Sequence, residues 1–153
     1  MNAQEFLNSH PGWSAVIFSA YFVGLWCFVT TIISFVGGWF QLSRKFKLAR
    51  PFDGVSEGLR SGQMRWLAHY GNCLRLGANG DGLYLSVLFL FLFMHPPLLV
   101  PWSEIKVRRK KRWIFGEYVT FTMGSDLQIP LRISGTSASM LQDSAGIHWP
   151  REA

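Results

Sequence analysis

The stretch AVIFSAYFVGLWCFVTTIISFV, residues 15–36, decides the architecture of this 153-residue chain because it is almost uniformly apolar. It lies inside a longer window, residues 7–43, that contains no Lys, Arg, Asp or Glu. At about 1.5 Å of rise per residue, a helix of this length covers roughly 33 Å, enough to cross the hydrocarbon core of a bilayer. The sequence therefore predicts a single transmembrane helix over residues 13–40.

Two other interpretations of this stretch fit less well. A secretory signal peptide has a basic start, a shorter apolar run and a small-residue cleavage site. Here the only formal charge before the run is Glu5, and the run ends in large aromatic residues. A buried helix of a soluble protein is normally shorter and carries a polar stripe. We therefore expect a single-pass membrane protein.

The residues that flank the span predict its orientation. Aromatic rings are favoured at the level of the lipid headgroups, and cytoplasmic flanks carry an excess of Lys and Arg. No basic residue precedes the span, and several follow it at once. We expect the N-terminus outside and the rest of the chain in the cytoplasm, at a cell membrane such as the bacterial inner membrane. The expected interface residues are Trp13, Trp39, Phe40, Arg44, Lys45 and Lys47.

Composition separates the chain into an apolar front and a basic remainder. All 15 Lys and Arg residues lie after Ser43, and the remaining length suits one globular domain with its own core. Pro51 and two glycines among charges indicate a juxtamembrane linker. The expected organisation is a tail at 1–12, the span at 13–40, a basic linker at 41–60, a β-domain at 61–147 and a tail at 148–153.

Beyond residue 60 the pattern is typical of short strands separated by turns. The segment Asn79-Gly80-Asp81-Gly82 is a strong tight-turn signal, and 117–123 and 127–133 alternate between apolar and polar residues. Residues 137–145 predict a short helix with Thr136 as its N-cap. The sequence thus predicts seven short strands followed by one helix. Trp102, near the bend at Pro101, is expected to be a core anchor beneath that helix.

Two phrases carry a resemblance to a known superfold: Asp81-Gly82-Leu83-Tyr84-Leu85, and Pro97-Leu98-Leu99-Val100-Pro101-Trp102-Ser103-Glu104-Ile105. They are similar to a stretch of uncharacterised membrane-anchored bacterial proteins and to PH-like domains, including GRAM-type members. The resemblance covers residues 62–147. It implies a mainly-β domain of bent antiparallel strands closed by a C-terminal helix. The superfold serves lipid binding, peptide binding and scaffolding, so it does not choose among these functions.

Residues 83–93 are open to three interpretations. They belong to a charge-free stretch, residues 82–103, and their apolar side chains would occupy both faces of a strand. Such a run fits a strand that is buried on both faces or touches the membrane with its outer face. It also fits a re-entrant or second membrane segment, although it is short for one, or a dimer-forming surface. We expect the strand.

The strongest chemical signal is a basic run that ends in an aromatic residue, in which six of seven successive positions are cations. A cluster of this kind near an anionic leaflet contributes about 1 kcal/mol per Lys or Arg. We expect it to contact anionic lipid headgroups; a merely solvated hairpin is the other interpretation. Nucleic acid is a weaker candidate because interleaved aromatic residues are lacking. The predicted lipid-binding residues are Lys106, Arg108, Arg109, Lys110, Lys111, Arg112 and Trp113.

Residue types that carry catalysis do not form a recognisable pattern. The four histidines are scattered, without metal-ligand spacing, and Ser103 lacks the context of a nucleophile. We expect neither an enzyme nor a cofactor or metal site. The predicted function is therefore a membrane-anchored binding or scaffolding protein whose partner is the anionic lipid bilayer. The alternative is an assembly subunit of a membrane complex that recruits a protein partner through residues 83–93 and the span.

Overall fold

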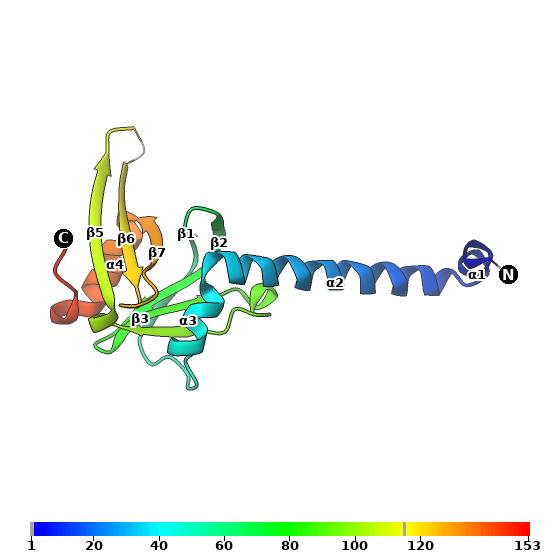
Figure 1. The fold of residues 1–153 in the computed structure, drawn as a ribbon, viewed down its shortest axis with the longest axis horizontal. Coiled ribbons are helices and arrows are strands. Elements are labelled where there is room, and N and C mark those ends of the chain that lie inside the picture. The colour runs from blue at the N-terminus through cyan, green and yellow to red at the C-terminus, as the bar shows by residue number, and fades with distance from the viewer. Residues whose placement is uncertain (1, 115) are drawn as a thin grey trace.

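A long helix leads into a curled β-domain in the computed structural model, which describes residues 2–114 and 116–153 (Figure 1). The N-terminal helices are α1 (Ala3–Ser9), α2 (Pro11–Gly37) and α3 (Trp39–Phe46). The strands are β1 (Val55–Met64), β2 (Ala68–Ala78), β3 (Gly82–Val87), β4 (Leu98–Pro101), β5 (Ile105–Arg112), β6 (Gly116–Met123) and β7 (Ile129–Ser134). Helix α4 (Gly135–Ala145) follows them, and short 3-10 turns lie at Phe89–Phe91, Trp102–Glu104 and Gly146–His148.

Helix α2 is the expected apolar helix, and it projects from the β-domain as a rod (Figure 1). Pro11 occupies its first turn, where a missing N–H costs nothing. Residues 12–37 form one helix that is long and apolar enough to cross a membrane, and most of their side chains are exposed. An exposed apolar surface of this extent is typical of a contact with lipid or with another protein.

Gly38 separates α2 from α3 and fixes how α2 joins the β-domain. Its φ of 86° is left-handed, and a Cβ on it would lie 2.8 Å from the Ile129 side chain. A Cβ on Gly37 would lie 2.8 Å from the Cβ of Ala68 on β2. Both positions therefore require glycine. Gly38 needs it because its φ is left-handed and a side chain would clash, and Gly37 needs it only because a side chain would clash.

Helix α3 belongs to the β-domain, which corrects two expectations. Trp39 and Leu42 are fully buried in the core, so Trp39 does not face lipid headgroups as predicted. The expected linker over residues 41–60 is shorter, because α3 extends to Phe46 and β1 begins at Val55. An amphipathic helix is stabilised when its apolar side packs against the apolar face of a sheet. Helix α3 does this directly after the bend at Gly38, where it buries Trp39, Leu42 and Phe46.

The seven strands form one antiparallel sheet in the order β4-β3-β2-β1-β7-β6-β5. Strand β1 pairs with β2 along its length but with β7 only through Gly62, Gln63 and Met64. Register shifts in β1 between Glu57 and Gly62 interrupt the β1–β2 ladder. Irregularities of this kind increase twist and bend, and they allow the sheet to curl around its own core.

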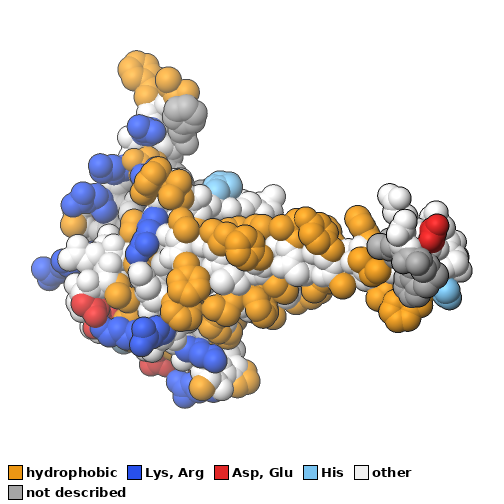
Figure 2. Space-filling view, turned by 45° about the vertical axis from the view of Figure 1, so that its right-hand side comes forward, with side chains coloured by type: hydrophobic (Ala, Val, Ile, Leu, Met, Phe, Trp, Pro, Cys, Tyr) orange, Lys and Arg blue, Asp and Glu red, His pale blue; other side chains and the backbone are white. Residues whose placement is uncertain are grey.

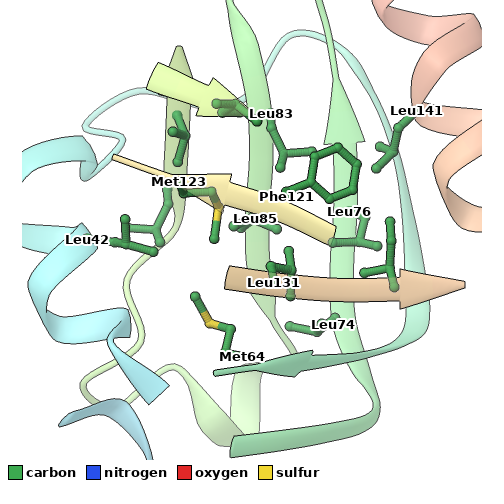
Figure 3. Close-up of a cluster of buried hydrophobic side chains, with 14 of the residues drawn as sticks. Leu42, Met64, Leu74, Leu76, Leu83, Leu85, Phe121, Met123, Leu131 and Leu141 are labelled. Atoms are coloured by element: carbon green, nitrogen blue, oxygen red, sulfur yellow. The ribbon is translucent and has the colours of Figure 1, made fainter. Parts of the chain in front are cut away.

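The core lies inside the curl, between the sheet, α3 and α4 (Figure 3). Strands β2 and β3 contribute buried leucines, and Phe121 of β6 lies opposite them. Helix α4 adds Leu141 and covers one end. The helix begins two residues earlier than predicted, since the Ser134 hydroxyl, not Thr136, caps it by accepting from the Ser137 N–H at 3.3 Å.

Residues 83–93 do not form the single long strand that we expected. Strand β3 ends at Val87, and the chain then makes a 3-10 turn over Phe89–Phe91. Apolar side chains that were expected to be buried are exposed here, beside α2. A longer strand would have no neighbour to pair with, because β2 pairs with β3 only as far as Val87 and β4 pairs only with Gly82–Leu85.

The C-terminal residues pack onto the β-domain, and Trp102 lies among them. The Trp102 ring is half-buried and 5.7 Å from the Trp149 ring, and its indole N–H donates to the Asn79 carbonyl at 2.8 Å. Trp149 also packs edge-on against Phe121 at 5.6 Å. The expected tail over residues 148–153 is thus in contact with the core, and Trp102 is a partly exposed contributor to it.

Candidate functional site

The basic run forms strand β5, whose alternation sends its cations to two different faces of the sheet. Ile105 and Val107 are buried, and Lys106, Arg108 and Lys110 point to the outer face. Opposite them on β6 stand Thr122, Thr120 and Tyr118 in register. The period of two in a strand separates the cations in this way.

Strand β7 adds a fourth cation to the outer face. Arg132 pairs in register with Thr120, which pairs on its other side with Arg108. The Arg132 guanidinium lies 4.6 Å from the centroid of the Tyr118 ring, a cation–π contact that holds it over the sheet. We call Lys106, Arg108, Lys110 and Arg132 the basic face.

The basic face lines a shallow groove of about 310 Å³. Among the residues that line it in the described part of the chain, no Asp or Glu side chain occurs. A second hollow of about 350 Å³ shares Thr120 and Arg132 with the first and continues to Arg65 and Trp66 in the β1–β2 turn. Among the described residues, no ion pair involves the cations of the basic face. Cations in a concave surface attract anions, so the groove suits an anionic ligand.

Arg65 connects this groove to the base of α2. Its guanidinium donates to the Val36 carbonyl at 3.2 Å and to the Gln41 side chain at 2.6 Å. Val36 is one residue from the end of α2. The groove therefore begins beside the end of the apolar helix and extends across β7 and β6 to β5.

Arg109 does not belong to this surface, which corrects its place among the predicted lipid-binding residues. It points to the other face of β5 and donates to Glu152 at 2.9 Å, Glu117 at 2.6 Å and the Gln142 side chain at 3.1 Å. Hydrogen bonds to Glu152 and Glu117 raise the pKa of the Arg109 guanidinium, and the bond from Arg109 lowers the pKa of Glu152. Its charge is thus neutralised within the fold.

The end of the basic run lies at the tip of the β5–β6 hairpin. Lys111, Arg112, Trp113 and Ile114 are exposed. The hairpin is on the side of the β-domain opposite to the free length of α2, and its tip points across the helix axis (Figure 1). On the face shown in Figure 2, Lys and Arg side chains gather on the β-domain, while hydrophobic ones cover α2.

The other predicted interface residues take different positions. Trp13 is exposed in the first turns of α2, and the Phe40 ring stacks on Phe35 at 4.4 Å at the end of the helix. Lys45 pairs with Asp126 at 2.9 Å, and this contact raises the pKa of Lys45 and lowers that of Asp126. Arg44 and Lys47 are exposed on and just after α3.

A buried polar cluster lies where α3 meets the chain after the apolar turn. His95 is 1 % exposed; its Nδ1 faces the Phe93 carbonyl at 3.1 Å, and its Nε2 is 3.1 Å from the Tyr70 hydroxyl. A carbonyl only accepts, so Nδ1 carries the hydrogen and the Tyr70 hydroxyl donates to Nε2. Burial lowers the pKa of His95, which is therefore neutral. The cluster serves the fold, because each ring nitrogen already has a partner.

Sequence reasoning missed Arg132 and the turn that carries Arg65 and Trp66. Arg132 is a single cation in an alternating strand, and only the register of β6 and β7 brings it beside Arg108. Among the described residues no three His, Cys, Asp or Glu side chains come together to hold a metal ion. Comparison with protein-family models, curated proteins and solved structures finds no match to this chain. The PH-like resemblance stays a prediction.

Proposed function

We propose that this chain is a membrane-anchored, non-catalytic binding module that contacts anionic lipid headgroups through its basic face. In this proposal α2 spans a bilayer once, and the basic residues after it hold the β-domain on the cytoplasmic side, at a cell membrane such as the bacterial inner membrane. The length and composition of α2 support the span. The cations that line the groove on the outer sheet face support an anionic ligand.

The observation that carries the proposal is the continuity of the groove. Its two hollows share Arg132, and the second ends at Arg65 and Trp66, beside the last turn of α2. A phosphate group at the surface of the bilayer that α2 crosses would reach this end first. Trp66 is 78 % exposed there, and indole rings are favoured at the headgroup level.

This geometry restricts the proposed lipid contact to fewer residues of the basic run than the sequence predicted. Arg65 and Arg132 lie toward α2, and Arg108 is the next cation along the same row of the sheet. The hairpin tip, with Lys111, Arg112 and Trp113, lies away from the free length of α2 (Figure 1). We therefore place lipid contact at the α2 end of the groove, and the tip outside it.

Calorimetric titration of the full chain in zwitterionic detergent tests the proposal. Short-chain phosphatidylglycerol should bind, and short-chain phosphatidylcholine should not; inorganic phosphate distinguishes a lipid site from a simple phosphate site. Replacing both Arg108 and Arg132 by Gln should weaken binding roughly 10- to 30-fold, since each cation near an anionic surface contributes about 1 kcal/mol.

A matched control is the double variant Arg75→Gln, Arg151→Gln, which removes the same charge from exposed positions outside the groove. It should bind phosphatidylglycerol as the parent does. Equal weakening in both double variants would show that net charge alone causes the attraction, and that the basic face is not a site.

A second candidate function, an assembly subunit that recruits a protein partner, is favoured by the hairpin tip. Trp113 is fully exposed and Ile114 is 84 % exposed at the tip of the β5–β6 hairpin. The hairpin lies on the side of the β-domain opposite to the free length of α2 (Figure 1). Exposed aromatic residues of this kind are enriched at protein interfaces. A photo-crosslinking amino acid at position 113 in whole cells should capture a protein under this function and only lipid or nothing otherwise.

A further inference from the structure

We propose that residues 88–94, the apolar loop, insert into the hydrocarbon of the bilayer beside α2, where lipid acyl chains cover their exposed side chains. The proposal rests on the proposed span of α2 and adds a second membrane contact to it. Four large side chains in the loop are exposed, with Phe89 at 76 % and Leu90 at 56 %. The chain carries no formal charge from residue 82 to 103, so every exposed group of the loop suits an apolar medium.

The loop is fixed against the side of α2. The Trp26 indole N–H donates to the Leu90 carbonyl at 3.0 Å, and the Trp26 and Phe91 rings lie 5.1 Å apart. Further along the helix, the Ser34 hydroxyl donates to the Met94 carbonyl at 2.6 Å. The loop thus follows α2 over at least two turns, and it buries Ser34 completely.

These contacts determine the depth of the loop. Helix α2 has 27 residues and is about 40 Å long, whereas the hydrocarbon core is about 30 Å thick and needs about 20 residues. The first possible 20-residue window is 11–30 and the last is 18–37, so residues 18–30 lie in hydrocarbon in every placement. Phe22, Val23 and Trp26 belong to this common part, and together with Leu90 they line an apolar hollow. Leu90 is therefore at hydrocarbon depth.

Six carbonyl groups of the loop have hydrogen-bond partners within the protein, as lipid requires. Carbonyl groups in hydrocarbon must be hydrogen-bonded within the protein, because no water is present to pair with them. The carbonyls of Leu88, Phe89 and Leu92 accept from backbone N–H groups of Phe91, Leu92 and His95. Side chains of Trp26, His95, Ser34 and Trp39 pair with the carbonyls of Leu90, Phe93, Met94 and Pro96.

This pattern distinguishes acyl chains from the other possible occupants. A protein partner could satisfy loop carbonyls itself, whereas lipid tails cannot. Here backbone N–H groups and the side chains of Trp26, Ser34 and His95 already satisfy them. The contacts of the loop with Trp26 and Ser34 fix the β-domain relative to α2, and insertion of the loop limits how far the β-domain can tilt against the bilayer. The angle between the bilayer and the groove that starts at Arg65 is then limited in the same way.

Site-directed spin labelling of the full chain in phosphatidylcholine nanodiscs tests the insertion. In a background with Cys27→Ser and Cys73→Ala, single cysteines are placed at Leu90 in the loop, at Phe18 on the exposed side of α2, and at Trp113 in the hairpin tip. Collision rates with oxygen, which partitions into lipid, and with a water-soluble nickel chelate are compared. Phe93→Cys provides a second loop site if Leu90→Cys does not fold.

We expect the loop label to resemble the label at Phe18, with severalfold lower nickel accessibility than the label at Trp113 and higher oxygen accessibility. A loop label as accessible to nickel as the one at Trp113 would overturn the insertion. A loop label that neither reagent reaches would also overturn it, because a second copy or a partner helix would then cover the loop. Nickel accessibility at Phe18 would instead refute the span itself, so the two failures can be told apart.

Discussion

Outside α2, the apolar loop and the tip of the β5–β6 hairpin both expose large apolar side chains, but they are held in different ways. The loop is attached to α2 by hydrogen bonds from Trp26 and Ser34, and Trp39 of α3 donates to Pro96, two residues after the loop. The tip stands at the end of a two-stranded ladder that closes at the Arg112–Gly116 pair. Exposed apolar side chains therefore suit different surroundings in the two regions. The loop, whose carbonyl groups are hydrogen-bonded within the protein, suits lipid. The projecting hairpin tip suits water and a protein partner.

The largest expected effect comes from Trp39, which holds the two residues that follow the loop. Trp39 is fully buried, donates to the Pro96 carbonyl at 2.9 Å and packs against His95 at 5.3 Å. Trp39→Ala should lower the free energy of unfolding by about 3–5 kcal/mol, because a large cavity opens in the core. Thermal unfolding of the full chain in detergent, followed by near-UV circular dichroism, measures the loss.

Trp113→Ala is the matched control at the hairpin tip. The ring is fully exposed, so the free energy of unfolding should change by no more than about 0.5 kcal/mol. A comparable loss in both variants would mean that the tip is packed in the folded protein. The contrast between an anchored loop and a projecting tip would then be wrong.

The sequence predicted which helices and strands form better than it predicted how these elements pack against one another. The apolar helix, the antiparallel sheet and the C-terminal helix follow from charge-free length, alternation and turn residues, all of which are local signals. Trp39 was misplaced because a tryptophan after an apolar run suits a headgroup region as well as a protein core. Only the bend at Gly38, which turns α3 onto the sheet, decides between them.

The candidate site was predicted in part for a similar reason. The basic run locates three members of the basic face, Lys106, Arg108 and Lys110, but alternation alone does not say which face of β5 is outside. Arg109 becomes a structural residue because Glu152, far along the chain, reaches it. Residues 83–93 were predicted wrongly because a nearly all-apolar run fits a buried strand and an exposed apolar turn equally well. Only the end of strand pairing at Val87 separates the two.

An intermediate effect is expected where the hairpin joins the β-domain. Arg109→Gln should cost about 1 kcal/mol of unfolding free energy, because it leaves Glu117 and Glu152 near each other without their shared cation, while partial exposure screens the interaction. Arg108→Gln, on the outer face of the same strand, should cost almost nothing. Chemical unfolding of both variants at low salt measures the difference, and high salt should reduce it. Equal stability of the two variants would mean that the network does not hold the hairpin.

The smallest expected effect is a pH dependence that comes from His95, directly after the loop, and not from the tip. His95 is neutral in the fold, and burial lowers its pKa below the ordinary value of 6.5 that it has in the unfolded chain. Below pH 6.5 the unfolded state therefore binds more protons than the folded state, so the free energy of unfolding falls as the pH falls. The slope cannot exceed about 1.4 kcal/mol per pH unit, the value for a single proton.

Unfolding midpoints of the full chain between pH 7.5 and 5.5 measure this dependence, and His95→Gln should flatten it at the cost of the bond to Tyr70. His69→Gln is the matched control, since His69 is exposed on β2 one residue from Tyr70. It should keep the dependence of the parent. If the parent curve is already flat, or if His69→Gln removes the slope, the neutral His95 is not the titrating group. The loop would then be anchored without any sensitivity to acid, as the hairpin tip is expected to be.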